Sequence, residues 1–437
     1  MSAASVTGKI LITGELRLKS PLLIGDGAGE TAENFRDIHV LKNAAGSAFI
    51  PGTSICGVLR EYVADTNPAL VEKIFGDADK FQSAIQFDDV QLEGGAVVVR
   101  DGVRIDGVTG TGVKGGKYDY EAVDRGAGGE IRMLVNLRGC HDTGEIQNAV
   151  AEILGALESG IRLGALTSKG FGLAVVENLT ADFYDFRNAA DVKAWLLGGA
   201  AANKIQAVGR NFASANDFVV DAEFALDSSF IVRDYEVGAA DREKNISAVS
   251  LRSGGDFVIP GTSLKGIFRH RAEYILSRLG VAARALNKLM GDSSGDAKIK
   301  SRFIVAESYV SAEKIGAIPH TRNKIDRFTG GTLQGTLFTT KPAWNKNSAT
   351  LKIRFEIQSA ADFEAGLALF LLRDIWLGHV ALGGEKSIGR GTVHGISASI
   401  DFRGKNYQLD SSGKVVAGDA AELAEFTATV KNWGESA

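Results

Sequence analysis

The chain contains the same series of motifs twice, and this duplication constrains its fold more than any other feature. The segment FIPGTSICGVLREYV at 49–63 aligns with VIPGTSLKGIFRHRA at 258–272. Further on, LGALTSKGFGLA at 163–174 aligns with LGGEKSIGRGTV at 382–393. Two shorter pairs lie between them: FGD with MGD (75–77, 290–292) and RIDGVTG with KIDRFTG (104–110, 324–330). Four matches in one order indicate a duplicated structural unit.

The duplication predicts two domains, 1–205 and 206–437, in a chain of 437 residues. Each half is long enough to bury a core of its own. The chain has 53 glycines against 6 prolines. Many of these glycines fall in the shared motifs, which indicates required backbone conformations rather than linkers.

Charge and cysteine usage narrow the class of protein. The net charge of -4 argues against a general polyanion binder but allows a local basic surface that holds nucleic acid. Two cysteines, Cys56 and Cys140, indicate a reducing compartment without a disulfide framework. The N-terminus lacks the apolar core of a signal peptide, and no stretch approaches the length of a membrane span. We expect a soluble, cytoplasmic protein that does not contact a membrane.

Hydrophobic periodicity predicts the same order of elements in each half. Period-two patterns predict strands at 218–226 and, less cleanly, at 9–18. Residues 301–310 also resemble a strand, and 83–90 is its counterpart in the first unit. Helical spacing predicts helices at 148–161, at 363–377 and after both IPGTS motifs, where Thr262 or Ser263 is a natural N-cap. Each unit therefore reads strand, helix, strand, long insertion, helix, Gly-rich turn, strand. This order predicts an α+β fold of two tandem ferredoxin-like (RRM-like) domains.

The helix after IPGTS carries basic side chains. In the second copy these are Lys265, Arg269, His270 and Arg271, and the first copy has Cys56 at the Lys265 position. Free amides at a helix N-terminus behind a Gly-Thr-Ser entry form a ready phosphate site. The alternative is a capped surface helix with a solvated basic face.

The two Gly-rich turns are Ser168-Lys169-Gly170-Phe171-Gly172 and Ser387-Ile388-Gly389-Arg390-Gly391. Alternating glycines let a backbone approach a ligand closely and expose its amides. A single GxG is usually a plain turn. Two copies at matched positions, each beside a basic residue, favour a ligand-binding turn.

The order of these motifs, with IPGTSLKGIFR at 259–269 as its most specific segment, resembles the RAMP superfamily of CRISPR-associated proteins. The chain is most similar to backbone subunits of type III CRISPR effector complexes, with two units fused. The resemblance implies that the basic helices and Gly-rich turns hold guide RNA by its phosphates. It also implies that 104–120 and 322–338 are thumb hairpins that interrupt the guide–target duplex, with aromatic residues near the return at Tyr118, Tyr120 and Phe338.

The expected partners are CRISPR guide RNA, complementary target RNA and other effector subunits. Specificity would come from base pairing rather than from protein contacts. The residues expected to bind RNA are Thr53, Ser54, Arg60, Ser168, Lys169, Gly170, Gly172, Thr262, Ser263, Lys265, Arg269, Arg271, Ser387, Gly389, Arg390 and Gly391.

The resemblance also implies a metal-dependent endoribonuclease. Family members that cut RNA use an Asp in the loop before the IPGTS strand, and Asp37 matches that position, with His39 two residues on. Asp37 would bind a divalent cation, Mg²⁺ or Mn²⁺, or help to deprotonate a ribose 2′-OH that attacks the adjacent phosphorus. The alternative for Asp37 is a solvated loop carboxylate.

The second unit departs from this pattern. Asn245, Ile246 or Ser247 stands at the position of Asp37, and Asp241 lies several residues away. We therefore expect the first unit to cut and the second to bind only. The neighbouring Asp88 and Asp89 point to opposite faces of a strand, so a structural role is expected. The alternative functions are a non-catalytic guide-RNA scaffold and a guide-precursor processing endoribonuclease.

Overall fold

The computed structural model describes residues 5–27, 38–77, 82–107, 109–208, 216–234, 238–292 and 298–435. These residues form two compact units. The first comprises 1–99, 119–167 and 171–212, and the second comprises 100–118, 168–170 and 213–437. The domain boundary expected at 205/206 stays a prediction.

The first unit is built on an antiparallel sheet with the strand order β10-β9-β1-β7-β3. The strands are β1 Val6–Leu18, β3 Ile85–Phe87, β7 Gly128–Arg138, β9 Leu173–Asp185 and β10 Asn203–Lys204, with β8 Ile161–Arg162 paired to β9. In β1, Ile10 and Ile12 are buried and lie opposite Val135 and Met133 of β7. Their period-two burial is the pattern that predicted this strand.

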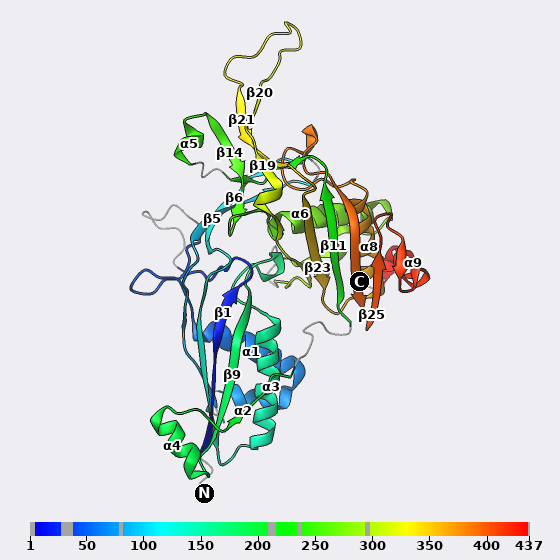
Figure 1. The fold of residues 1–437 in the computed structure, drawn as a ribbon. Helices are drawn as coiled ribbons and strands as arrows, with labels where there is room; N and C mark the ends of the chain where they lie inside the picture. The colour runs from blue at the N-terminus through cyan, green and yellow to red at the C-terminus, as the bar shows by residue number, and fades with distance from the viewer. Residues whose placement is uncertain are drawn as a thin grey trace. The chain divides into compact units, whose positions relative to one another are not determined.

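Helices cover one face of this sheet (Figure 1). They are α1 Gly52–Thr66, α2 Pro68–Phe75 and α3 Thr143–Ser159. A further helix, α4 Ala189–Leu197, packs through Trp195 on Tyr184 of β9, away from these three (Figure 1). Leu59 of α1 and Ile153 of α3 share one buried cluster with Ile10. The helix predicted at 148–161 begins earlier because the Asp142 side chain accepts hydrogen bonds from Gly144 N and Glu145 N.

The second unit repeats this plan with a sheet of order β17-β23-β11-β24-β25-β26. The strands are β11 Phe218–Leu226, β17 Phe303–Val305, β23 Thr350–Ile357, β24 Val393–Phe402, β25 Lys405–Leu409 and β26 Val415–Ala417. The helices are α5 Ala239–Arg242, α6 Gly261–Arg278, α7 Asn287–Met290, α8 Asp362–Trp376 and α9 Ala420–Thr429. The strand predicted at 218–226 and the helix predicted at 363–377 are confirmed.

Short strands complete both units. They are β2 Phe49–Ile50 with β4 Val90–Gln91, then β12 Ser229–Phe230, β13 Arg233–Asp234, β14 Ile246–Ser250, β15 Arg252–Ser253, β16 Asp256–Ile259, β18 Ser308–Val310, β19 Ile315–Ala317 and β22 Ala343–Asn345. The strand predicted at 301–310 is two strands, β17 and β18, and that at 83–90 likewise divides into β3 and β4. The fold class is α+β with mostly antiparallel sheets. In the described part of the chain, no helix is long and apolar enough to cross a membrane.

Two hairpins occupy the long insertions. The first hairpin consists of β5 Val97–Ile105 and β6 Gly112–Val123, and its outer part, 100–118, belongs to the second compact unit. The second hairpin consists of β20 His320–Arg322 and β21 Phe338–Lys341. It projects from the body of the second unit, with the connecting residues forming a long loop (Figure 1).

The N-caps of α1 and α6 correct one prediction. Pro51 and Pro260 occupy the N-cap positions without side-chain hydrogen bonds, so the expectation that Thr262 or Ser263 caps α6 is wrong. The first residue of each helix packs instead on backbone carbonyls from distant parts of the chain. A Cβ on Gly52 would lie 2.7 Å from Phe87 O, and one on Gly261 would lie 2.1 Å from Lys169 O and 3.0 Å from Val305 O. Close packing therefore sets both helix starts and requires glycine there.

Candidate functional site

The tips of both hairpins contain the same turn, built around an aspartate. In the second hairpin, Asp326 Oδ1 accepts hydrogen bonds from the amides of Phe328 and Thr329, each at 2.8 Å, and Gly330 N donates to Asp326 O at 3.0 Å. In the first, Asp106 Oδ1 accepts from Thr109 N at 2.7 Å, and Gly110 N donates to Asp106 O at 2.9 Å. This turn explains why the IDxxTG motif is duplicated.

The aspartate in the turn of the second hairpin is stabilised in its charged form. Hydrogen bonds from the amides of Thr329 and Phe328 keep the pKa of Asp326 below its usual range. Gly330 adopts a positive φ of 69°, which a side chain would strain. The tip is therefore formed before any ligand arrives.

This preformed tip presents an aromatic ring to solvent. Phe328 is 99% exposed, and Ile325, Leu337 and Phe338 nearby are also exposed. Exposed rings of this kind stack on unpaired bases or enter between base steps. Sequence reasoning placed the aromatic contacts near the hairpin return and missed Phe328, although the motif KIDRFTG contained it.

The first hairpin places its aromatic residues differently. Tyr120 is buried, and its ring lies 5.9 Å from that of Phe171 at the Gly-rich turn. Tyr118 covers Gly102, where a Cβ would meet its ring at 2.2 Å. Tyr120 is therefore buried and Tyr118 half-buried, in contrast to the exposed ring of Phe328.

The arginine shared by the two IPGTS helices has the same partner in each unit. Arg60 Nη1 donates to Gly76 O at 3.1 Å, and Arg269 Nη2 donates to Gly291 O at 2.6 Å. These glycines belong to the matched FGD and MGD motifs. The contact links α1 to the end of α2 and α6 to the end of α7, which explains why both motifs recur together.

Lys265 is buried and held by three oxygens. Its Nζ lies 2.8 Å from Ser168 Oγ, 2.7 Å from Ser301 Oγ and 3.4 Å from Ser168 O. Burial, followed by the charges of Lys169 and Arg269, lowers the pKa of Lys265 to about 7. The ammonium that sequence reasoning assigned to a phosphate therefore has internal partners.

Other predicted RNA contacts have internal partners as well. Arg271 Nε donates to Asp374 Oδ2 at 2.6 Å. Gly52 N, the first amide of α1, donates to Asp89 Oδ1 at 2.8 Å, so a carboxylate already occupies this helix N-terminus and the structural role expected for Asp89 is confirmed. Thr53 is exposed, and the side chains of Ser54, Thr262 and Ser263 are half-buried in the first turns of their helices.

The last glycine of each Gly-rich turn is held by hydrogen bonds to backbone outside the turn. The amides of Gly172 and Gly391 donate to Pro21 O and Ser229 O, each at 2.7 Å. A Cβ at either position would lie 1.9 Å from a leucine carbonyl, Leu163 O or Leu382 O, so only glycine fits. These two amides are therefore not available to a ligand.

The remaining turn positions differ in accessibility. Ser387 and Gly389 are exposed, and a Cβ on Gly389 would meet nothing within 4 Å. Gly170 is buried, Ser168 and Lys169 are half-buried, and Arg390 is buried. The second turn thus offers the more open backbone of the two.

The predicted catalytic residues lie on the segment before β2. Asp37 falls outside the described residues. His39 Nδ1 lies 3.5 Å from Glu121 Oε2, which is also 3.6 Å from Lys42 Nζ and accepts from Val40 N at 3.3 Å. Glu121 comes from β6, so the hairpin strand and this segment meet at one carboxylate.

Glu121 is a candidate that sequence reasoning missed. A carboxylate beside an imidazole orients the ring. His39 Nε2 is buried and has no hydrogen-bond partner among the described residues. Within the described residues, no group of three His, Cys, Asp or Glu side chains could hold a metal ion.

In the second unit the loop before the IPGTS strand also meets a hairpin strand. There the loop carries the carboxylate and the hairpin strand carries the ammonium. Ile246 pairs in parallel with Thr339 as Ile38 pairs in parallel with Tyr120, which aligns Asn245 with Asp37. Asp241 accepts from Lys341 Nζ through both carboxylate oxygens at 3.0 Å. An ion pair with a hairpin strand therefore engages the alternative catalytic carboxylate.

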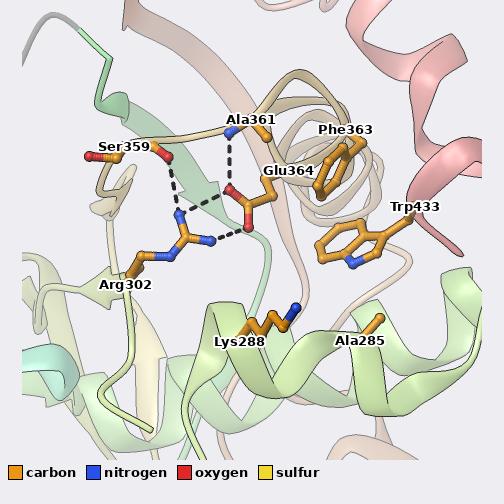
Figure 2. Close-up of a pocket in the computed structure, with 8 residues that line it drawn as sticks. All are labelled: Ala285, Lys288, Arg302, Ser359, Ala361, Phe363, Glu364 and Trp433. Atoms are coloured by element: carbon orange, nitrogen blue, oxygen red, sulfur yellow. Dashed lines mark hydrogen bonds and ion pairs between the residues drawn. The ribbon is translucent and has the colours of Figure 1, made fainter. Parts of the chain in front are cut away.

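A cavity of about 380 Å³ lies in the second unit at the start of α8 (Figure 2). Arg302 donates to Glu364 and to the carbonyls of Gln358 and Ser359, at 2.8 and 3.1 Å for the carbonyls, so its guanidinium fixes the turn before the helix. Phe363 and Trp433 form the apolar wall. Lys288 is the remaining basic lining residue, and a single ammonium beside a structural ion pair does not define a catalytic site.

Comparisons with known proteins give one family. The model of the RAMP superfamily matches residues 15–176 and 195–394, one region in each half of the chain. A comparison with curated proteins gives no match.

Proposed function

The chain belongs to the RAMP superfamily, whose members are generally CRISPR-associated RNA-binding proteins, and from this premise we propose that it is a backbone subunit of a type III effector complex. Two backbone units would be fused in one chain. The spatial strand orders are β9-β1-β7-β3 and β24-β11-β23-β17. In chain order a helix follows the first and the third of these strands in each unit, which supports a ferredoxin-like fold.

The observation that carries this proposal is the preformed hairpin tip with its exposed Phe328. We infer that the two hairpins are thumb insertions and that the second inserts Phe328 into a guide–target duplex. Unstacking a base step costs a few kcal/mol, and a ring that is already placed loses little further freedom on insertion. Base pairing would supply the sequence specificity.

We place the endoribonuclease activity in the first unit. Asp37 would help to remove the proton from the ribose 2′-OH, and that oxygen would attack the adjacent phosphorus while the bond to the 5′ oxygen breaks, leaving a cyclic phosphate and a free 5′-hydroxyl. His39, held beside Glu121, would donate the proton that the leaving oxygen requires. In the second unit Asn245 has no acid–base function, and Lys341 neutralises Asp241.

Guide-dependent cleavage tests the proposal. The assembled complex is incubated with end-labelled complementary RNA and with a non-complementary RNA of the same length, each with Mg²⁺, with Mn²⁺ or with a chelator. The proposal predicts cuts only in the complementary RNA. Guide-dependent binding without any cut would support the non-catalytic scaffold, and cutting of the guide precursor instead would support processing.

A further inference from the structure

Three arginines share a buried carboxylate, Glu385, which lies two residues before the second Gly-rich turn. The Glu385 side chain is 3% exposed, and its Oε1 accepts from Arg233 Nη2 at 3.1 Å and from Arg322 Nη2 at 2.6 Å. Its Oε2 accepts from Arg390 Nε at 2.8 Å. Arg322 lies on β20, so this carboxylate joins the turn to the stem of the second hairpin.

A second contact joins the same two elements through Arg390. Its Nη2 lies 2.7 Å from Nδ1 of His320, which is also on β20, and its Nη1 donates to Ser229 Oγ at 2.8 Å. The guanidinium lies over the Trp344 ring at 5.1 Å. Since an arginine only donates, His320 Nδ1 must be an acceptor in this arrangement.

The pKa of Glu385 depends both on its burial and on its three arginine partners. Burial raises the pKa of Glu385, but hydrogen bonds from Arg233 and Arg390 and the charge and hydrogen bond of Arg322 outweigh it and hold the pKa below its usual range. The carboxylate is therefore charged at neutral pH. Removing it would leave the buried Arg390 uncompensated, which is far costlier than losing an exposed ion pair.

The first unit makes the same connection with apolar side chains. The aligned turn places Leu166 at the Glu385 position, and both residues adopt a positive φ of 57°. Phe171 stands at the Arg390 position and packs on Tyr120 of β6 at 5.9 Å. Each unit therefore ties its Gly-rich turn to a hairpin strand, by ring packing in one and by ion pairs in the other.

We propose that Glu385 is a positioning residue that fixes the second hairpin to the Gly-rich turn, so that Phe328 enters the duplex at one defined base step. This inference rests on the proposed role of the hairpin as an RNA wedge. The turn contacts the RNA backbone through its exposed Ser387 and Gly389, and the network sets the spacing between that contact and the tip. Both units connect the Gly-rich turn to a hairpin strand, although one uses ring packing and the other uses ion pairs. This indicates that the connection itself is retained.

The mechanical part is tested without RNA. Amide hydrogen exchange of His320–Arg322 and Phe338–Lys341 is measured in the full chain for wild type and Glu385→Gln. We expect exchange at least about tenfold faster in the variant because the stem loses its anchor. Asp227→Asn, which alters the exposed Asp227–His394 pair elsewhere in this unit, is the matched control and should leave these amides unchanged.

A second variant guards against loss of folding. Arg390→Lys keeps the buried charge but cannot bond Glu385, Ser229 and His320 in one plane, so it should also speed exchange. Unchanged exchange in every variant that folds would overturn the tie between turn and hairpin.

The positioning part is tested in the assembled complex with 2-aminopurine placed at successive target positions. Wild type should give enhanced fluorescence at one position facing the second hairpin. Glu385→Gln should spread the signal over neighbouring positions while guide affinity stays within about threefold, because the exposed turn contacts remain. A single sharp position in the variant, despite faster exchange, would overturn the positioning role.

The two failures are distinguishable. If wild type itself shows no enhanced position, the RNA wedge of the proposed function is wrong, and the positioning role fails with it. The exchange result would still report whether Glu385 ties the turn to the hairpin.

Discussion

The two units carry the same junction between loop and hairpin with opposite charges. In the first, a carboxylate on the hairpin strand, Glu121, gathers His39 and Lys42 from the loop. In the second, an ammonium on the hairpin strand, Lys341, holds Asp241 from the loop. The loop side chains that Glu121 gathers in the first unit are basic, whereas the second unit pairs its loop carboxylate with a lysine. Duplication has kept the geometry and changed the chemistry.

What the two units share is structural. Arg60 and Arg269 bind equivalent glycine carbonyls, and Gly172 and Gly391 close equivalent turns. Residues that recur in both copies therefore maintain the unit, and residues that differ between the copies are the better candidates for function. Phe328 is such a residue.

The largest effect should come from the carboxylate that only the first unit has. Asp37→Ala should slow single-turnover cleavage by the complex about 10²–10⁴-fold, the range for loss of an acid–base group, with guide binding unchanged. The exposed Asp65 on α1, replaced by Ala, is the control. Cleavage at the wild-type rate in Asp37→Ala would remove the catalytic assignment.

The exposed ring of the second hairpin should have the next largest effect. Stacking on one base contributes about 1–3 kcal/mol, so Phe328→Ala should weaken target binding about tenfold and abolish the local base unstacking. Val416→Ala, an exposed apolar residue on β26, is the control. If both variants bind target equally well, the tip is an ordinary turn.

The arginine shared by both units should affect stability rather than RNA. Arg269→Ala leaves Gly291 O without this donor and should lower the free energy of unfolding by about 1–3 kcal/mol. Urea unfolding followed by fluorescence reports mainly on the second unit, because three of the four tryptophans, Trp344, Trp376 and Trp433, lie there. The exposed Arg278 on the same helix is the control.

The salt dependence of guide binding completes this test. The slope of log K against log salt should be the same for Arg269→Ala and wild type, since no phosphate contact is lost. A flatter slope for Arg269→Ala would show that Arg269 does bind a phosphate. The purely structural role would then apply only to Arg60.

The smallest effect concerns Lys265 and pH. Its folded-state pKa near 7 lies below the 10.5 of an ordinary lysine, so between these values the unfolded chain binds more protons and stability rises with pH. From pH 7 to 9 wild type should gain about 1–2 kcal/mol relative to Lys265→Met. The exposed Lys352, replaced by Met, should give no such difference, and parallel curves for Lys265→Met and wild type would contradict the buried state of the ammonium.

Much of the fold could be predicted from the sequence because it depends on local periodicity. The strand at 218–226 and the helix at 363–377 follow directly from spacing. The start of α6 could not be predicted, because the carbonyls of Lys169 and Val305 that pack on Gly261 determine it. These contacts are formed by residues far apart in the chain.

The candidate site could be predicted less well, for a related reason. Residue type shows that Lys265 and Arg271 are basic, but not that Ser168, Ser301 and Asp374 take up their donors. Glu121 and Phe328 lie in hairpins whose long-range pairing sets their exposure. Sequence spacing carries no information on either.

The central claim is that one unit cuts and the other only binds, and mapping of cut sites tests it most directly. Wild type, Asp37→Ala and Asp241→Ala are assembled with the same guide, and the products of one labelled target are resolved at single-nucleotide length. The account predicts one cut for each copy of the chain, lost in Asp37→Ala and retained in Asp241→Ala. A second, separate cut that disappears only in Asp241→Ala would show that the second unit is also an enzyme.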